Sequence, residues 1–538
     1  MLAKQGFANE TSHREKNQNH MLPKRFHALI AGLLVISSGL SRGAENIGGA
    51  KQLFVDNRII GSLGSAKRVF KQAVKTGPLL SASTAWERRR SLAYPTVRRE
   101  GVNSWKIWYR AGTPSGERAI CYATSKDGVT WTKPKLGIYP HNGGNNNIVL
   151  IGSETFVDTP SVFKEDDGYY LYCIEGDVRY VIYHSPDGIH NWRKASRGLH
   201  ADHARIVQSG TYAPASHNYD ICLGVYDQYQ KDYIFHFKVA HKEKLFGPND
   251  WQRKFCQHRY SGSLARIQDT LFPLVRPHHE LADKTDEALE PGTLRAENYG
   301  MGMYPQEDGS VIGFSWLFSI DGHNGLVSVG GDGTSDGFWH YGPINVMLVY
   351  SRDIDGPWLR PTTTPILPRG PAGSWDGGMV HTANTPVEVP RAETSGATTD
   401  QVWMYYGGAN HLHNRNPSSG ERDHRFGIAK WRIDGFAALE DTDGEEDTII
   451  SRAIRFSGNQ LTLNADVESN GYIKVKFRPA EAGADLKGWS DAVTGDHQKH
   501  VVRWGGEDDI GNCAGKEVIL EFRVKDAALY SLDFTPDA

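Results

Sequence analysis

Hydrophobic and polar residues alternate over short segments along most of the chain, and clusters of Gly, Asp, Asn and Pro separate these segments. Residues 93–131 show the unit: an apolar strand, a turn, an aromatic-rich strand, a second turn, and a strand ending in Ser-x-Asp-Gly before a tryptophan. Alternation with a period of two predicts β-strands rather than helices. The pattern therefore predicts an all-β chain.

The same unit recurs, in clear or degenerate form, in five copies. The copies end at Trp131, Trp192, Trp251, Trp358 and Trp431. One such unit cannot cover both faces of its sheet, so successive units are expected to pack face to face around an axis. We predict a five-bladed β-propeller over residues 50–438.

The Ser-x-Asp-Gly turns have a structural explanation. In a tight hairpin the Asp side chain caps turn amides and the Gly takes a positive φ. We therefore expect Asp127, Asp187 and Asp353 to be structural, and the tryptophans that follow them to pack between blades.

The pattern changes after about residue 440. An acidic linker, Asp-Thr-Asp-Gly-Glu-Glu-Asp, precedes segments such as 472–477 and 518–524, in which apolar and polar residues alternate strictly. This alternation is typical of a half-buried antiparallel sheet. We predict a C-terminal β-sandwich over residues 448–538.

The N-terminal segment has the composition of a leader. Lys24 and Arg25 precede an apolar run, Ala28 to Ile36, which is too short to span a bilayer, and small residues follow. We predict that residues 1–44 are a signal peptide with an N-terminal extension, and that the mature protein is secreted or periplasmic. An uncleaved membrane anchor is the alternative for this segment, and we expect no membrane span in the mature chain.

Charge and composition narrow the class of partner. The net charge is −3 and no basic run is present, which argues against a nucleic-acid partner. Aromatic residues make up 11% of the chain, and their rings can stack on the apolar C–H face of a sugar, although most are expected in the core. The five cysteines show no CxxC spacing, so we expect buried free thiols, with one disulfide pair left open.

A family resemblance rests on the second repeat. Its Asp158-Thr-Pro-Ser-Val-Phe, followed by Asp-Gly-Tyr-Tyr-Leu-Tyr, resembles the Asp-Pro segment of the five-bladed propeller glycoside hydrolases of families 32, 43 and 117. Over residues 50–535 the chain also resembles bacterial secreted family 32-like proteins. The resemblance implies a glycosidase with a carbohydrate substrate, and it implies that Asp158 points into the central pocket.

The chain departs from the family 32 pattern at both catalytic segments. Ala93-Tyr94-Pro95-Thr96 stands where family 32 carries its nucleophilic acid, and no Glu-Cys pair supplies the acid/base. The two catalytic positions are therefore open, and fold alone does not decide the reaction.

Hydrolysis of a glycoside usually needs two carboxyl groups, one to protonate the leaving oxygen and one to attack or to activate water. Acids at the starts of inner strands are the natural supply in a propeller. The candidates are Asp158, Glu297, Asp376 and Asp56. Asp158 would contact sugar hydroxyls, Glu297 would be the general acid, and Asp56 would replace the missing first acid. Each also has a structural explanation as a turn, cap or surface residue.

Candidate substrate-binding residues lie near the same strand starts. They are Asp202, His203, His381, Trp375, Tyr299 and Trp86. His381 is of interest because family 117 uses a histidine as its acid, whereas the aromatic residues would be sugar platforms.

Three hypotheses follow. The first is a metal-independent glycoside hydrolase without a cofactor, although a structural calcium ion on the axis stays open. The second is a non-catalytic carbohydrate-binding propeller, which the missing first acid favours. The third, ranked last, is a six-bladed sialidase-like propeller, because Ser-x-Asp-Gly-x-x-Trp is similar to the sialidase turn.

Overall fold

The computed structural model describes residues 43–87, 92–113, 117–152, 157–176, 179–195, 221–242, 251–267, 293–321, 326–328, 338–340, 342–354, 356–413 and 422–536. In these ranges the chain is all-β, as predicted. The helical elements are short 3-10 turns: η1 (Ala85–Glu87), η2 (His141–Gly144), η3 (Leu264–Arg266), η4 (Arg391–Glu393) and η5 (Gly511–Cys513). None of the helices in the described ranges is long and apolar enough to cross a membrane.

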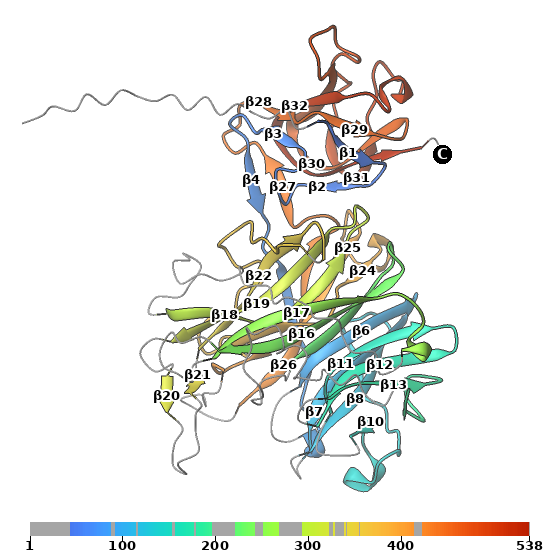
Figure 1. Ribbon diagram of the computed structural model, residues 1–538, viewed down its shortest axis with the longest axis vertical. Coiled ribbons are helices and arrows are strands. Elements are labelled where there is room, and N and C mark those ends of the chain that lie inside the picture. The colour runs from blue at the N-terminus through green and yellow to red at the C-terminus, as the bar shows by residue number, and fades with distance from the viewer. Residues whose placement is uncertain are drawn as a thin grey trace, which may run out of the picture. The chain divides into compact units, whose positions relative to one another are not determined.

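The first three repeats each form a separate antiparallel sheet (Figure 1). The first contains β6 (Ala93–Gly101), β7 (Ser104–Gly112), β8 (Arg118–Ser125), β9 (Trp131–Thr132) and β10 (Ile148–Ile151). The second contains β11 (Val157–Glu165), β12 (Gly168–Glu175), β13 (Arg179–Ser185) and β14 (Arg193–Lys194). The third contains β15 (Cys222–Asp227), β16 (Asp232–Lys242) and β17 (Trp251–Tyr260).

The fourth and fifth repeats are joined in one sheet by a single parallel pair, Ile344 with Met379. The fourth contributes β18 (Thr293–Pro305), β19 (Val311–Asp321) and β22 (Ile344–Ser351). The fifth contributes β23 (Met379–Thr382), β24 (Val387–Val389), β25 (Gln401–Ala409) and β26 (His424–Arg432). A hairpin of β20 (Leu326–Ser328) and β21 (Phe338–His340) lies in the chain between β19 and β22.

The fifth repeat is completed by a strand from before the first repeat. β5 (Val74–Ser81) pairs antiparallel with β26, with Phe426 opposite Leu80 and Ala429 opposite Lys75. The strand pairing therefore links the beginning of the repeat region to its end.

The first strands of the five repeats contact one another in a closed circuit. β6 contacts β11, β11 contacts β15, β15 contacts β18, β18 contacts β23, and β23 contacts β6. We call these five the inner strands. Glycine permits the tightest of these approaches, because a Cβ on Gly302 of β18 would lie 2.4 Å from the carbonyl oxygen of Ala383.

The predicted turn capping is confirmed in the first two repeats. Oδ1 of Asp127 accepts the amides of Val129 and Thr130, and Oδ1 of Asp187 accepts those of Ile189 and His190. Although partial burial opposes ionisation, these amide donors, preceded at Asp187 by the hydrogen bond to the His190 ring, lower the pKa of both carboxyls to about 2.

The same turns dock aromatic side chains from the neighbouring sheet. Trp108 of the first repeat donates to the carbonyl of Gly188, and Tyr405 of the fifth donates to that of Gly128, at 2.7 and 2.6 Å. Trp131 packs edge-on against Tyr405 at 6.0 Å. All of these contacts lie between sheets, and the contact of Trp131 is the one predicted for a tryptophan that follows a turn.

The C-terminal strands form a sheet with a core of its own. In β30 (Gln460–Pro479) the buried residues Ile473, Val475 and Phe477 alternate with partly exposed ones, as the sequence pattern predicts. The other C-terminal strands are β27 (Ala437–Glu440), β28 (Asp447–Ser451), β29 (Ile454–Phe456), β31 (Gly495–Val501) and β32 (Val518–Thr535).

Four N-terminal strands pair within this C-terminal sheet (Figure 1). They are β1 (Glu45–Gly48), β2 (Gln52–Leu53), β3 (Ile60–Ser62) and β4 (Lys67–Phe70). Phe54, Ile59 and Ile60 lie in its core. The predicted boundaries, 50–438 and 448–538, assign most of this segment to the repeats, because alternation within a strand does not specify its partner.

The four cysteines whose side chains the structure describes agree with the expectation of buried thiols, and Cys256 lies outside them. Cys121, Cys173, Cys222 and Cys513 are free and buried. Burial raises the pKa of Cys121 and Cys173 well above the usual value, so these thiols are unreactive core residues.

Candidate functional site

Three inner strands share one irregularity near their starts. Their register shifts between Ala93 and Thr96 in β6, Asp158 and Ser161 in β11, and Asn298 and Met301 in β18. The residue after the first of each pair begins the bulge, and Tyr94 and Thr159 there adopt positive φ values of 53° and 49°. Bulges re-aim side chains at strand ends. By register, Asp158 corresponds to Ala93 and Asn298 in the other two strands.

Asp158 is held by two arginines from the first repeat. Nε of Arg110 donates to Oδ1 at 3.2 Å and Nη1 of Arg118 donates to Oδ2 at 2.7 Å. The amide of Thr159 also donates to Oδ1, at 2.8 Å. The carboxylate side chain is only 3% exposed, whereas that of Arg118 is 42% exposed. A buried carboxylate is thus fixed by donors from β7, β8 and its own strand.

Tyr94 connects this ion pair to the other inner strands. The Arg110 guanidinium lies 5.6 Å from the centroid of the Tyr94 ring, in a cation–π contact. The same ring stacks on Trp316 of β19, with centroids 5.9 Å apart and planes 14° apart.

His381 of β23 lies where three aromatic rings meet. Its ring centroid is 6.0 Å from that of Tyr94, 5.8 Å from Tyr299 and 5.1 Å from Trp316. Trp316 is fixed in turn by its Nε1, which donates to Oγ1 of Thr382 at 2.9 Å. We call Tyr94, Arg110, Asp158, Tyr299, Trp316 and His381 the inner-strand cluster.

Further cations and imidazoles surround Tyr299. Nζ of the buried Lys238 lies 4.0 Å from the centroid of its ring, and Nε2 of His413 lies 3.0 Å from its hydroxyl. Next to them, Nε2 of His411 lies 2.7 Å from Nε2 of His424. Desolvation, followed by the positive potential of His411, Arg110 and His381, holds the pKa of His424 well below its usual 6.5.

Glu297 is a buried acid on the strand that carries Tyr299. It is 1% exposed and lies opposite Phe318 in β19. By register it corresponds to Leu92 and Val157, which are core residues of the first two repeats. The first two repeats fill this position with hydrocarbon, whereas the fourth repeat places a carboxyl there.

Asp376 and Trp375 lie outside the inner-strand cluster. Asp376 forms an ion pair with Lys75 of β5 and accepts from Ser374 and from the hydroxyl of Tyr406, at 3.0 and 3.1 Å. Trp375 stacks on Tyr406 at 5.5 Å. These contacts join β5 to the fifth repeat, which favours a structural role for both residues over their predicted roles.

Asp56 and Trp86 are also engaged elsewhere. Asp56 accepts two hydrogen bonds from Arg352, at 2.7 and 3.0 Å, at the turn that follows β22. Trp86 is 2% exposed and belongs to the core of the repeat sheets, so its faces are not open to a sugar. The predicted binding residues Asp202 and His203 lie outside the described residues.

The structure therefore brings together Asp158, Tyr299 and His381 among the predicted residues. It adds Tyr94, Arg110 and Trp316 to the cluster, with Arg118, Lys238 and His424 at its edge. Arg110 lies near the end of β7, and Arg118 begins β8. The sequence shows that both lie on one hairpin, but two arginines on a hairpin are common on surfaces. Only their tertiary partner, Asp158, distinguishes them.

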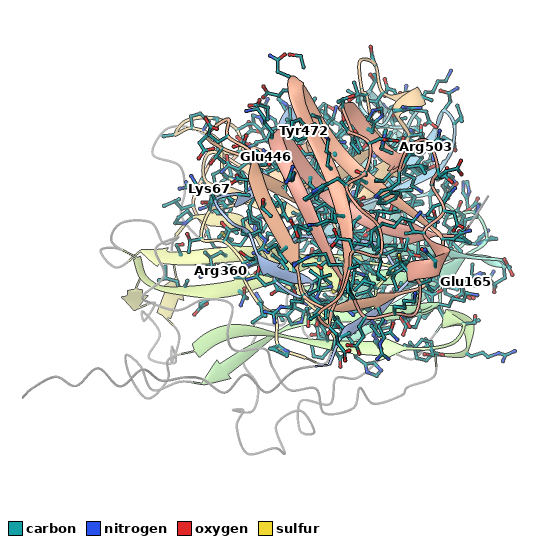
Figure 2. All side chains as sticks on the ribbon, turned by 90° about the horizontal axis from the view of Figure 1, so that it is seen from above. Lys67, Glu165, Arg360, Glu446, Tyr472 and Arg503 are labelled. Carbon is teal, nitrogen blue, oxygen red and sulfur yellow. The ribbon has the colours of Figure 1, made fainter. Side chains whose placement is uncertain are left out.

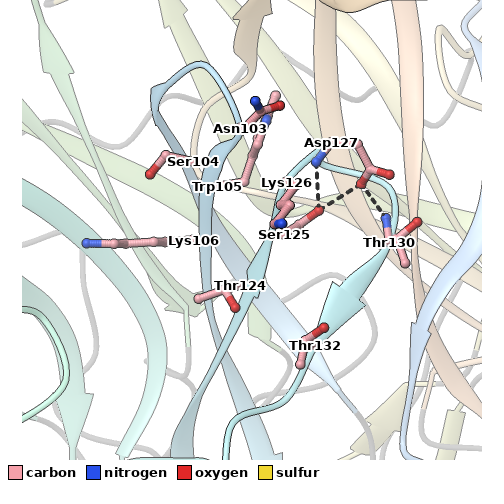
Figure 3. A pocket seen from close by; sticks show the side chains of 10 residues that line it. All are labelled: Asn103, Ser104, Trp105, Lys106, Thr124, Ser125, Lys126, Asp127, Thr130 and Thr132. Atoms are coloured by element: carbon pink, nitrogen blue, oxygen red, sulfur yellow. Dashed lines mark hydrogen bonds between the residues drawn. The ribbon is translucent and has the colours of Figure 1, made fainter.

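A separate hollow lies on the first repeat (Figure 3). It has a volume of about 610 Å³ and is lined by residues from β7, β8 and the turn at Asp127. Its acid, Asp127, caps its own turn. The hollow therefore brings no pair of acids together, and it is a weaker site candidate than the inner-strand cluster.

Metal-ligand geometry occurs elsewhere in the described residues. One carboxylate oxygen from each of Asp441, Asp443 and Asp447 lies within 4.8 Å of the others. Asp441 and Asp443 belong to the loop between β27 and β28, and Asp447 begins β28, so none of the three is part of the inner-strand cluster.

No protein-family model matches the sequence, and no match is found among curated proteins. Solved glycoside hydrolases show a distant structural similarity. The catalytic domain of a GH62 α-L-arabinofuranosidase from Coprinopsis cinerea is 12% identical, covers 67% of this chain and 97% of its own, and gives a TM-score of 0.39. An α-L-arabinofuranosidase from Podospora anserina is 14% identical, with coverages of 68% and 98% and a TM-score of 0.39. A thermostable family-43 glycoside hydrolase is 12% identical, with coverages of 68% and 96% and a TM-score of 0.41. Similarity at this level does not establish an activity for this chain.

Proposed function

We propose that the protein is a glycoside hydrolase that binds its carbohydrate substrate at the inner-strand cluster. The observation that carries the proposal is the meeting of Asp158, His381 and the stacked aromatic residues, which arrive from different sheets. The rings of Tyr94, Tyr299 and Trp316 are buried, so they form the frame of the site rather than open faces for a sugar. The partly exposed His381 and Arg118 can reach sugar hydroxyls from this frame. This combination suits a neutral, polyhydroxylated ring.

The proposed architecture is a five-bladed β-propeller followed by a β-sandwich. The circuit of contacts among the five inner strands supports the propeller, because blades that pack face to face place their first strands around a common axis. The separate core of the C-terminal sheet supports a second domain.

In this proposal Asp158 positions the substrate rather than reacting. Its charge is balanced by Arg110 and Arg118, so little of it remains to attack a sugar carbon. Oδ1 already accepts from Arg110 and from the amide of Thr159, whereas Oδ2 accepts from Arg118 and keeps a lone pair with which to accept from a sugar hydroxyl.

We assign the proton transfers to His381 and Glu297. His381 protonates the glycosidic oxygen, and the bond from that oxygen to the anomeric carbon breaks. A water molecule adds to the anomeric carbon and gives its proton to Glu297. His381 is partly exposed and so can meet the leaving group, whereas Glu297 is buried on the neighbouring inner strand.

Carbohydrate binding without hydrolysis is the second candidate function. It is favoured by Ala93, which occupies the register position of Asp158 in the first repeat, and by the full pairing of Asp158 itself. A site with one neutralised carboxylate can recognise a sugar without cleaving it.

One experiment separates the two functions. The purified protein and its Asp158→Asn, His381→Asn and Glu297→Gln variants are screened against polysaccharides and aryl glycosides, with Asp166→Asn, an exposed acid outside the cluster, as the control. Hydrolysis should fall about 100-fold or more in His381→Asn and Glu297→Gln and should be unchanged in the control. Saturable binding with no turnover would support carbohydrate binding without hydrolysis. Equal turnover in all variants would contradict the proton-transfer roles of His381 and Glu297.

We also propose that the mature protein is exported. The leader predicted for residues 1–44 supports this, and nearly all of it lies outside the described residues. N-terminal sequencing of protein recovered outside the cytoplasm should begin after the apolar run. A cytoplasmic product that retains Met1 or Met21 would contradict export.

A further inference from the structure

The segment that joins β27 to β28, together with the first residue of β28, gathers three carboxylates. Its sequence is Asp-Thr-Asp-Gly-Glu-Glu-Asp, residues 441–447. Asp441 organises the turn, because its Oδ1 accepts the amides of Asp443 and Gly444 and its Oδ2 accepts the amide of Asp526 on β32. One oxygen from each of Asp441, Asp443 and Asp447 consequently lies within 4.8 Å of the others. This spacing matches oxygens that share one cation.

Asp447 provides an independent indication of a ligand. Its residue is 1% exposed, and Oδ1 accepts from the hydroxyl of Ser65. Its Oδ2 is buried and receives no hydrogen bond within the described part of the chain. A buried carboxylate oxygen without a donor is costly, so native proteins normally satisfy it with a donor, an ordered water or an ion.

The neighbouring charged side chains are directed elsewhere. Glu446 is engaged by Tyr472 and by Arg523, and Figure 2 labels Glu446 and Tyr472 side by side on this face. Lys525 donates to the carbonyl of Gly444 rather than to a carboxylate of the loop. Among the described residues, Asp441, Asp443 and Asp447 form no ion pair with a Lys, Arg or His.

A second cluster of acids in the chain differs from this one, because arginines of the chain form ion pairs with its acids. Asp56, Asp308 and Glu45 come together at the N-terminal segment, where Arg58 and Arg352 pair with all three. The chain neutralises that cluster with its own cations. Asp441, Asp443 and Asp447 have no such pairing in the part of the chain that the structure describes, so a bound cation would balance their charge.

The geometry points to a calcium-binding site formed by Asp441, Asp443 and Asp447. Calcium takes six to eight oxygen ligands in flexible geometry, including carboxylates, carbonyls and water, whereas magnesium demands a tighter octahedron. Asp443 is exposed, which leaves that side of the loop open to water ligands. The ion would fix the connection between β27 and β28, two strands of the C-terminal sheet. This site is separate from the inner-strand cluster and does not depend on the proposed hydrolase function.

The test uses the full-length chain after treatment with a chelator and its removal. Titration calorimetry with CaCl₂ should show one saturable site, and saturating calcium should raise the Tm by at least about 2 °C. Asp443→Asn, a change at an exposed position, should weaken calcium binding at least about tenfold, because it removes a ligand charge. The control Asp166→Asn should bind calcium as the wild type does.

Each contrary result is decisive. Absence of saturable calcium binding in the wild-type protein, or unchanged affinity in an Asp443→Asn protein that has a native circular dichroism spectrum, would overturn the site. Magnesium affinity equal to that for calcium would overturn its assignment to calcium. The Asp447→Asn variant supplies a second check, because it should lose binding while the melting temperature measured without calcium rises or stays the same.

Discussion

Arg110 donates from Nε to Oδ1 of Asp158 across 3.2 Å, although the two residues belong to different repeats. The Arg110 side chain is 13% exposed and that of Asp158 is 3% exposed. The interaction therefore links two sheets through a nearly dry ion pair, and it orients the acid at the centre of the proposed site.

Replacement of Arg110 by Met should destabilise the protein by about 3 kcal/mol, because Asp158 then keeps only Arg118 and an amide as partners in a buried position. Urea unfolding measures the change. In the double variant with Asp158→Asn the loss should be smaller than the sum of the two single losses. Strict additivity would show that the pair is not coupled.

Stability should depend on His424 at mildly acid pH. His411 donates from Nδ1 to the carbonyl of Leu412, so in its neutral form its Nε2 accepts from Nε2 of His424, and protonation of His411 would set two donors face to face. Protonation of His424 is opposed by its burial and by the positive potential of its neighbours. The pKa of His424 is lowered in the folded state, so below about 6.5 the unfolded chain binds a proton that the folded chain does not.

The free energy of unfolding should therefore be flat above pH 7 and should fall below pH 6.5, with a slope of up to about 1.4 kcal/mol per pH unit from this group. Thermal melts between pH 5 and 8 measure it, and His424→Gln should remove that part of the slope. A variant with the same pH dependence as the wild type would contradict the assignment.

Lys75→Met should lower stability by about 2 to 4 kcal/mol, because it leaves Asp376 buried without its cation. The turnover of the folded fraction should not change, since neither residue contacts the inner-strand cluster among the described residues. Denaturation curves and activity measured well below the melting temperature separate the two effects. A loss of turnover at full folding would restore Asp376 as a catalytic candidate.

Gly128→Ala should destabilise the first repeat by about 2 kcal/mol. Gly128 has a φ of 72°, and a Cβ there would lie 2.7 Å from the hydroxyl of Tyr405. Gly137→Ala is the matched control, because its φ is 69° and no atom lies within 4 Å of the added Cβ. In the control, the free energy of unfolding should fall only by the backbone strain, which is about 1 kcal/mol. Equal losses in chemical denaturation would show that the Tyr405 contact adds nothing.

Alternation along the chain predicted the strands of the repeats and of the C-terminal sheet, because burial on one face of a sheet imposes a period of two. It did not predict that β1 to β4 pair with β27 to β32. Local alternation shows that a segment forms a strand, but it does not show which strand several hundred residues away is its partner. The turn acids Asp127 and Asp187 were predictable because their hydrogen bonds are local.

The candidate site was predictable only in part, for a related reason. An acid at the start of a strand can face the centre of the repeats or a cation on another strand, and the register decides which. The bulge after Asp158 turns its strand start toward Arg110, whereas Asp376 faces Lys75 and Asp56 faces Arg352. The last two partners lie about 300 residues away in sequence, so no local pattern distinguishes these acids from Asp158.

The pairing of β5 with β26 has a consequence for how the molecule is made. A ribosome releases residues 74–81 early, but the strand that covers them, residues 424–432, emerges after all the intervening repeats. Until then β5 lacks the strand with which it pairs, and its open backbone groups can pair with a strand of another copy. Moving β5 to follow β26 by circular permutation would make this contact local, and it should speed refolding and suppress aggregation of newly synthesised protein.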